Sequence, residues 1–86
     1  MATKKINIPS DDWTLLNQGG EVTQSSFVLK LKEGDVFIGS TANSNTKPKT
    51  EDCYNTTEGI VYTGTDYVYA KSSANTTATG IIDGMD

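Results

Sequence analysis

Apolar and polar residues alternate in short segments along the chain, and these segments are separated by Gly, Asn, Asp and Thr. The clearest segment runs from Ser26 to Lys32, where Phe27, Leu29 and Leu31 fall on one face and polar residues share the other face with Val28. This period of two residues is typical of a β-strand with one buried face. Apolar spacings of three and four, which mark an amphipathic helix, are not sustained anywhere in the sequence. The pattern therefore predicts an all-β chain.

Two hairpins are expected from the turn residues between neighbouring strands. In the first, Gly34 interrupts the pattern after Lys32, and the apolar run Val36–Ile38 resumes it; glycine readily adopts the positive φ of a tight turn. In the second, the segments 59–63 and 66–71 flank Gly64-Thr65. Val68 and Ala70 are expected to face the core, which would leave Tyr67, Tyr69 and Lys71 on the other face.

Two further strands are predicted at 13–16 and 77–82, giving about six short strands. The polar segment 40–52 contains Pro48 and is expected to form an exposed loop. Residues 1–10 are expected to be a flexible N-terminal arm, and 11–86 a single domain. The fold class predicted is a small antiparallel β-sandwich or β-barrel.

The composition suggests that the domain needs stabilisation beyond its own core and that self-association supplies it. Hydrophobic residues make up 35% of the 86 residues, so the core should be thin for a domain of this size. Cys53 is the single cysteine, which excludes an internal disulfide, and the chain has no histidine with which to build a structural zinc site. The partner expected first is therefore another copy of the chain, in a homotrimer or another symmetric oligomer.

Nucleic acid and membranes are not expected as partners. The formal net charge is -4, whereas nonspecific nucleic-acid binding depends on basic residues that neutralise phosphates. No stretch approaches the roughly 20 apolar residues of a membrane span, and the first residues lack the apolar run of a secretion signal. The pattern indicates synthesis in the cytoplasm.

The residues that usually perform catalysis are missing or poorly placed. Without histidine, the common triads and proton relays cannot form. Cys53 follows Glu51 and Asp52, whose charges disfavour a thiolate, and Asp11 and Asp12 lie in a predicted turn where aspartate commonly caps the backbone. No enzyme activity, cofactor or metal site is therefore expected.

Aromatic residues are the remaining candidates for contact surfaces. Large amphipathic side chains contribute strongly at protein interfaces, so an interface is predicted at Phe37, Tyr62, Tyr67 and Tyr69, although a core role for them is equally consistent with the pattern. Trp13 and Tyr54, together with the 40–52 loop, are the candidate ligand surface, since such rings can stack on sugars. A lone tryptophan in a small β domain is, however, more often a core residue.

The order of these features resembles small virion proteins of tailed bacteriophages. The similarity lies in a tryptophan-led first strand (Asp12-Trp13-Thr14-Leu15-Leu16), a polar loop with a proline (Thr46-Lys47-Pro48), and a late strand (Val68-Tyr69-Ala70-Lys71-Ser72) before a Thr-rich final strand. It spans Trp13 to Ile82. The chain departs from the pattern at Glu51-Asp52 and Cys53, where the loop returns to a strand.

This resemblance implies an all-β structural subunit of a phage particle, made in the host cytoplasm and located in the virion. We expect a capsid decoration or head-associated subunit that binds copies of itself and the major capsid or tail proteins. The alternative is a receptor- or glycan-binding module of a tail fibre, and a third reading is a small host-directed inhibitor that acts as a monomer.

Overall fold

The computed structural model describes residues 3–85, and these residues form an all-β structure of eight strands and one short 3-10 turn. The strands are β1 (Thr3–Ile8), β2 (Thr14–Leu15), β3 (Ser26–Glu33), β4 (Val36–Thr41), β5 (Tyr54–Thr56), β6 (Gly59–Tyr62), β7 (Tyr67–Ser72) and β8 (Ala78–Met85), and the 3-10 turn η1 is Thr50–Asp52. The six predicted strands are all present, and β1 and β5 are the two that the sequence pattern did not predict.

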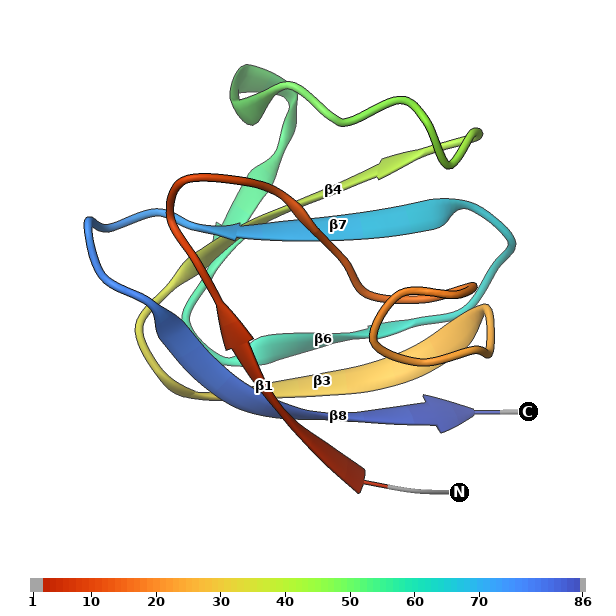
Figure 1. Ribbon diagram of the computed structural model, residues 1–86, viewed down its shortest axis with the longest axis horizontal. Coiled ribbons are helices and arrows are strands. Elements are labelled where there is room, and N and C mark those ends of the chain that lie inside the picture. Colours follow the sequence, from red (N-terminus) through yellow and green to blue (C-terminus); the bar gives the residue numbers. More distant parts are fainter. Residues whose placement is uncertain (1–2, 86) are drawn as a thin grey trace.

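The strands form two antiparallel sheets of four strands each, stacked as two layers (Figure 1). The first sheet has the order β1-β8-β3-β6, and the second has the order β2-β7-β4-β5. Neither sheet closes on itself among residues 3–85, so the arrangement is sandwich-like, and a closed barrel is not formed.

Both predicted hairpins are wrong, although their turns are where the sequence placed them. Gly34 has a φ of 86°, as a tight turn requires, but β3 before it belongs to the first sheet and β4 after it to the second. The chain likewise crosses from β6 to β7 between sheets, past Gly64. An alternating pattern specifies which face of a strand is buried. It does not specify whether the next strand pairs beside it or packs across the core from it.

The expected flexible N-terminal arm is also wrong within the described residues, which exclude positions 1 and 2. Residues 3–8 form β1, which pairs antiparallel with β8, and Ile8 lies opposite Ala78. Ile6 and Ile8 are buried between the layers at 4% and 0% exposure. Only two apolar side chains alternate with lysines and Asn7 here, a signal too short to stand out in the sequence.

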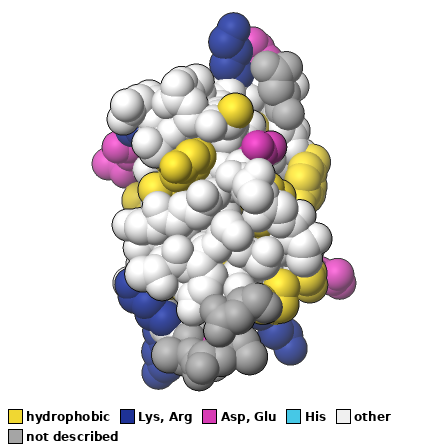
Figure 2. All heavy atoms as spheres, turned by 90° about the vertical axis from the view of Figure 1, so that its right-hand side faces the viewer, with side chains coloured by type: hydrophobic (Ala, Val, Ile, Leu, Met, Phe, Trp, Pro, Cys, Tyr) yellow, Lys and Arg dark blue, Asp and Glu magenta, His cyan; other side chains and the backbone are white. Residues whose placement is uncertain are grey.

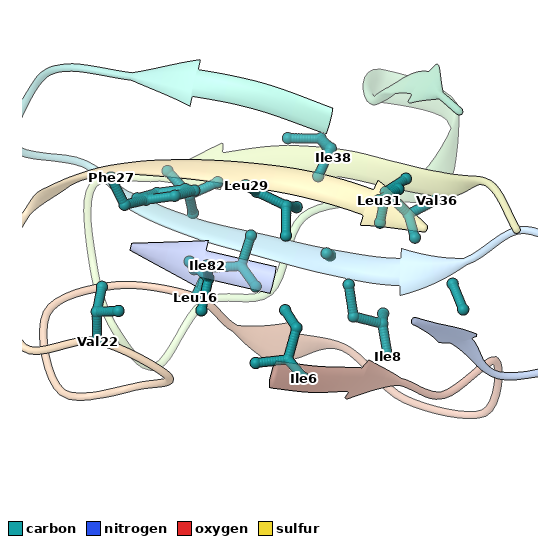
Figure 3. Packing of buried hydrophobic residues seen from close by; sticks show 13 residues of the cluster. Ile6, Ile8, Leu16, Val22, Phe27, Leu29, Leu31, Val36, Ile38 and Ile82 are labelled. Carbon is teal, nitrogen blue, oxygen red and sulfur yellow. The ribbon is translucent and has the colours of Figure 1, made fainter. Parts of the chain in front are cut away.

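The core consists of thirteen buried hydrophobic residues contributed by both layers (Figure 3). Phe27, Leu29 and Leu31 supply the β3 face that alternation predicted, and Val68 and Ala70 supply the β7 face. Fully burying one such Phe, Leu or Val side chain stabilises a fold by roughly 1.5–3 kcal/mol. The other members of the core are Ile6, Ile8, Leu16, Val22, Val36, Ile38, Ala78 and Ile82.

Candidate functional site

Three of the four aromatic residues predicted to form an interface share the outer face of the second sheet. In the register between β4 and β7, Phe37 lies opposite Lys71, Gly39 opposite Tyr69, and Thr41 opposite Tyr67. Because side chains alternate along a strand, Phe37, Tyr67 and Tyr69 all point away from the first sheet. Phe37 and Tyr67 are partly buried, and they remain candidates for contact with another protein.

Tyr69 is buried at 3% exposure although it lies on the outer face. Its hydroxyl donates a hydrogen bond to the Ser44 carbonyl, with 2.5 Å between the oxygens. The segment that follows β4 therefore covers this ring and uses its polar group. A side chain so enclosed has almost no surface to offer another subunit, so its predicted interface role does not fit the structure.

The loop between β4 and η1 is exposed, as predicted, and it is tied to the sheet beneath it. Lys47 Nζ lies 3.0 Å from Asp12 Oδ1, which connects the loop to the turn before β2. The hydrogen bond from Lys47, assisted by one from the Trp13 backbone N–H, lowers the pKa of the Asp12 carboxyl. The side chain of Pro48 packs so closely over Gly39 that a Cβ at Gly39 would come within 2.7 Å of its Cβ.

Cys53 also lies over Gly39, at the end of this loop. A Cβ on Gly39 would come 2.5 Å from the cysteine Sγ, and the Sγ itself donates a hydrogen bond to the Lys49 carbonyl at 3.1 Å. Glycine at position 39 is thus what allows the loop to approach the sheet. The described contacts of Cys53 thus belong to the packing of this loop against the sheet.

Tyr62 lies on the core side of β6 rather than on an outer face. It is opposite Phe27 in the register, with ring centroids 5.8 Å apart, and it packs against the core cluster. Its hydroxyl oxygen accepts a hydrogen bond from the Asp66 backbone N–H at 2.9 Å. These contacts give Tyr62 a structural role in closing the turn between β6 and β7.

The two members of the candidate ligand surface are not brought together. Trp13 precedes β2 and Tyr54 begins β5, and these strands are the opposite edges of the second sheet. Lys71 Nζ lies 5.5 Å from the centroid of the Trp13 ring, so the lysine ammonium group covers one face of that ring. The structure therefore provides no shared aromatic platform for a sugar from these two residues.

The side of the molecule formed by β5 and β6 carries the exposed large hydrophobic residues among those described. Val61 on β6 is 69% exposed and Tyr54 on β5 is 56% exposed. Sequence reasoning missed Val61, yet a signal was present. Ile60, Val61 and Tyr62 are consecutive apolar residues, and in a strand with alternating faces the middle one must point away from the other two.

A pocket of about 290 Å³ opens between the sheets on this same side. Its lining combines core-facing residues of both layers with the edge tyrosines: Ile38, Gly39, Ser40, Tyr54, Ile60, Tyr62 and Val68. Partial burial in this region raises the pKa of the Tyr54 phenol. The two layers are therefore incompletely closed where β5 and β6 meet.

Metal-binding clusters are absent among the side chains that the structure describes, because their Cys, Asp and Glu residues form no group of three or more that could hold a metal ion. Asp12, the best-connected carboxylate, accepts from Lys47 and from the Trp13 backbone. None of the helices in the described part of the chain has the length and apolarity to cross a membrane.

Comparisons with known proteins return no relative. No protein-family model, no curated protein and no solved structure matches this chain. The resemblance to phage virion proteins therefore rests on the sequence motifs alone, and the functional argument rests on the surface described above.

Proposed function

We propose that this protein is a structural subunit of a tailed-phage particle, a capsid decoration or head-associated protein that acts by binding copies of itself and the shell. The observation that carries the proposal is the open edge of the sandwich formed by β5 and β6. There Tyr54 is 56% exposed at a pocket between the sheets, and Val61 is 69% exposed on the outer face of β6. Exposed apolar side chains at the open edge of a sheet favour contact with another protein.

The face of the molecule shown in Figure 2 is compatible with a role in assembly. On this face uncharged polar groups and backbone predominate, hydrophobic atoms form separate small patches, and most of the charged side chains lie near the edge. This face therefore carries no strongly charged patch of the kind that binds nucleic acid.

The contact residues in this proposal differ from those that the sequence suggested. Tyr69 and Tyr62 are engaged within the domain, by Ser44 and by Asp66 respectively. Val61 and Tyr54 replace them as the leading contacts. Phe37 and Tyr67, on the outer face of the second sheet, would form a second surface that could face the shell.

The test is whether the chain is part of the particle. Phage particles from cells that encode the chain would be purified on a density gradient, and peptides of the chain would be sought by mass spectrometry. We expect it at many copies per particle, with immunogold label on the head. Gradient-pure particles that lack the chain would overturn the proposal, and label confined to the tail fibres would favour the receptor-binding alternative.

The receptor-binding alternative has its own test on the opposite edge of the second sheet. Deleting residues 43–49 would be a poor experiment, because it removes the carbonyl that Tyr69 needs and the partner of Asp12. Trp13→Ala is cleaner, since it removes the aromatic ring and leaves the loop contacts in place. A receptor or glycan binder should lose its target in this variant, whereas a decoration protein should still bind its shell.

A further inference from the structure

Strand β6 is a free edge of the first sheet. The sheet order β1-β8-β3-β6 leaves it paired on one side only. The Leu31 N–H donates to the Glu58 carbonyl at 2.9 Å, and Leu31 and Glu58 continue the register in which Leu29 faces Ile60. Because hydrogen-bonding direction alternates along an antiparallel pair, the backbone groups of Ile60 point to β3 and those of Val61 point outward.

The composition of β6 lacks the charged and proline residues that often protect an edge strand. Its four residues, Gly59 to Tyr62, include no charge and no proline. The opposite edge of the same sheet, β1, carries Lys4 and Lys5, and Lys4 forms an ion pair with Glu21 at 3.1 Å. Lysine on an edge strand opposes pairing with another strand. The contrast between the two edges marks β6 as the one open to pairing.

We propose that two copies of this chain pair antiparallel through β6 about a two-fold axis, which joins their first sheets into one continuous sheet. This inference rests on the self-association part of the proposed function. An isologous contact requires that one patch be complementary to itself. The β6 edge meets that requirement, because its outward backbone donor and acceptor at Val61 can pair with the same groups of a second copy.

The registers that keep every side chain on its own face are few. The Gly59 N–H and carbonyl are both already hydrogen-bonded to Thr56 Oγ1. We therefore place Val61 opposite Val61 of the second copy. In this register the exposed Val61 side chain is covered by its counterpart.

Charge does not oppose this pairing. With Val61 opposite Val61, Glu58, which immediately precedes β6, would fall opposite Gly64 of the second copy and not opposite another acidic residue. The second sheet adds to the contact, because Tyr54 at the start of β5 lies on the same side and lines the same pocket as Ile60 and Tyr62. Pairing along β6 would bring the two Tyr54 rings toward each other.

The contact is small, so the dimer should depend on protein concentration. Stable specific interfaces bury about 1,200–2,000 Å² in total. The β6 edge offers four residues per copy, which is a short contact by comparison. Repetition on a particle surface would strengthen it, because neighbouring copies are held at high effective concentration.

The experiment is sedimentation equilibrium of the full chain over a wide concentration range, with three variants. Val61→Lys places a charge on the β6 edge, and Asn7→Lys, at an exposed position on β1, is the matched control on the other edge. Tyr54→Ser removes the ring on β5. We expect a reversible dimer for wild type and Asn7→Lys, a monomer for Val61→Lys, and at least a several-fold weaker dimer for Tyr54→Ser. Matching thermal transitions would show that all four proteins are folded.

Other outcomes overturn the inference. These are a wild type that stays monomeric at every concentration, an oligomer other than a dimer, a dimer that persists in Val61→Lys, or one that Asn7→Lys also disrupts. The result is separable from the test of the proposed function. A monomer found in phage particles would refute β6 pairing alone, whereas a β6 dimer absent from particles would refute the virion role alone.

Discussion

Asn17 is the fully buried polar side chain whose removal we expect to be most damaging. It has 0% exposure and makes three hydrogen bonds to backbone groups. Its Nδ2 donates to the carbonyls of Ser25 at 2.7 Å and Asp66 at 3.0 Å, and its Oδ1 accepts from the Val68 N–H at 2.9 Å. One side chain thus joins the segment before β3 to the start of β7.

The loss in Asn17→Ala can be worked out group by group. The Asp66 carbonyl keeps a hydrogen bond, because Gln18 Nε2 also donates to it at 2.9 Å. The Val68 N–H and the Ser25 carbonyl lose the bonds that Asn17 supplies. A buried polar group left unpaired costs about 1–3 kcal/mol, so we expect a loss of about 3 kcal/mol in the free energy of unfolding.

Chemical and thermal denaturation followed by circular dichroism measure this loss. For a domain of this size the melting temperature should fall by about 12–24 °C, at roughly 4–8 °C per kcal/mol. Asn75→Ala, at an exposed position before β8, is the matched control and should change stability little. A loss below about 1 kcal/mol in Asn17→Ala would refute the reasoning, because it would mean that water or relaxation satisfies both groups.

Asn17→Asp adds a pH signature to the same argument. A carboxylate can still accept from the Val68 N–H, but it cannot donate to the two carbonyls. Burial and the facing carbonyl oxygens should raise the pKa of this new carboxyl in the folded state. The variant should therefore regain stability as pH falls, since its protonated form can donate one bond. A loss that does not change between neutral and acidic pH would contradict this account.

Three further predictions concern the loop and the first turn. Tyr69→Phe removes the hydroxyl bond to Ser44, and it should cost about 1 kcal/mol and speed amide hydrogen exchange over residues 42–49. Lys47→Ala should raise the pKa of Asp12 toward its usual value in an NMR titration. The Lys47–Asp12 contact contributes stability above the unfolded-state pKa of Asp12, and this contribution is lost as pH falls through the lowered folded-state pKa. The stabilities of variant and wild type should therefore converge in acid. Gly34→Ala forces an L-residue into a φ of 86° and should cost roughly 1–2 kcal/mol in urea denaturation, while an unchanged midpoint would show that the turn relaxes.

Local pattern determined the strands and their buried faces. Alternation placed Phe27, Leu29 and Leu31 on the core side of β3, and Val68 and Ala70 on the core side of β7, as the structure has them. The period of two residues is a property of the extended backbone itself, so it can be read without knowing any partner strand.

Tertiary structure decided which strands pair and which side chains remain accessible. The tight turn at Gly34 is compatible with a hairpin or with a crossing between sheets, and the choice depends on how both apolar faces are best buried. Tyr69 is buried because a loop from elsewhere in the sequence folds over it, whereas Val61, on the outer face of β6, is 69% exposed. Strand pairing and side-chain burial depend on contacts between residues far apart in the chain. A local sequence pattern does not specify these long-range contacts.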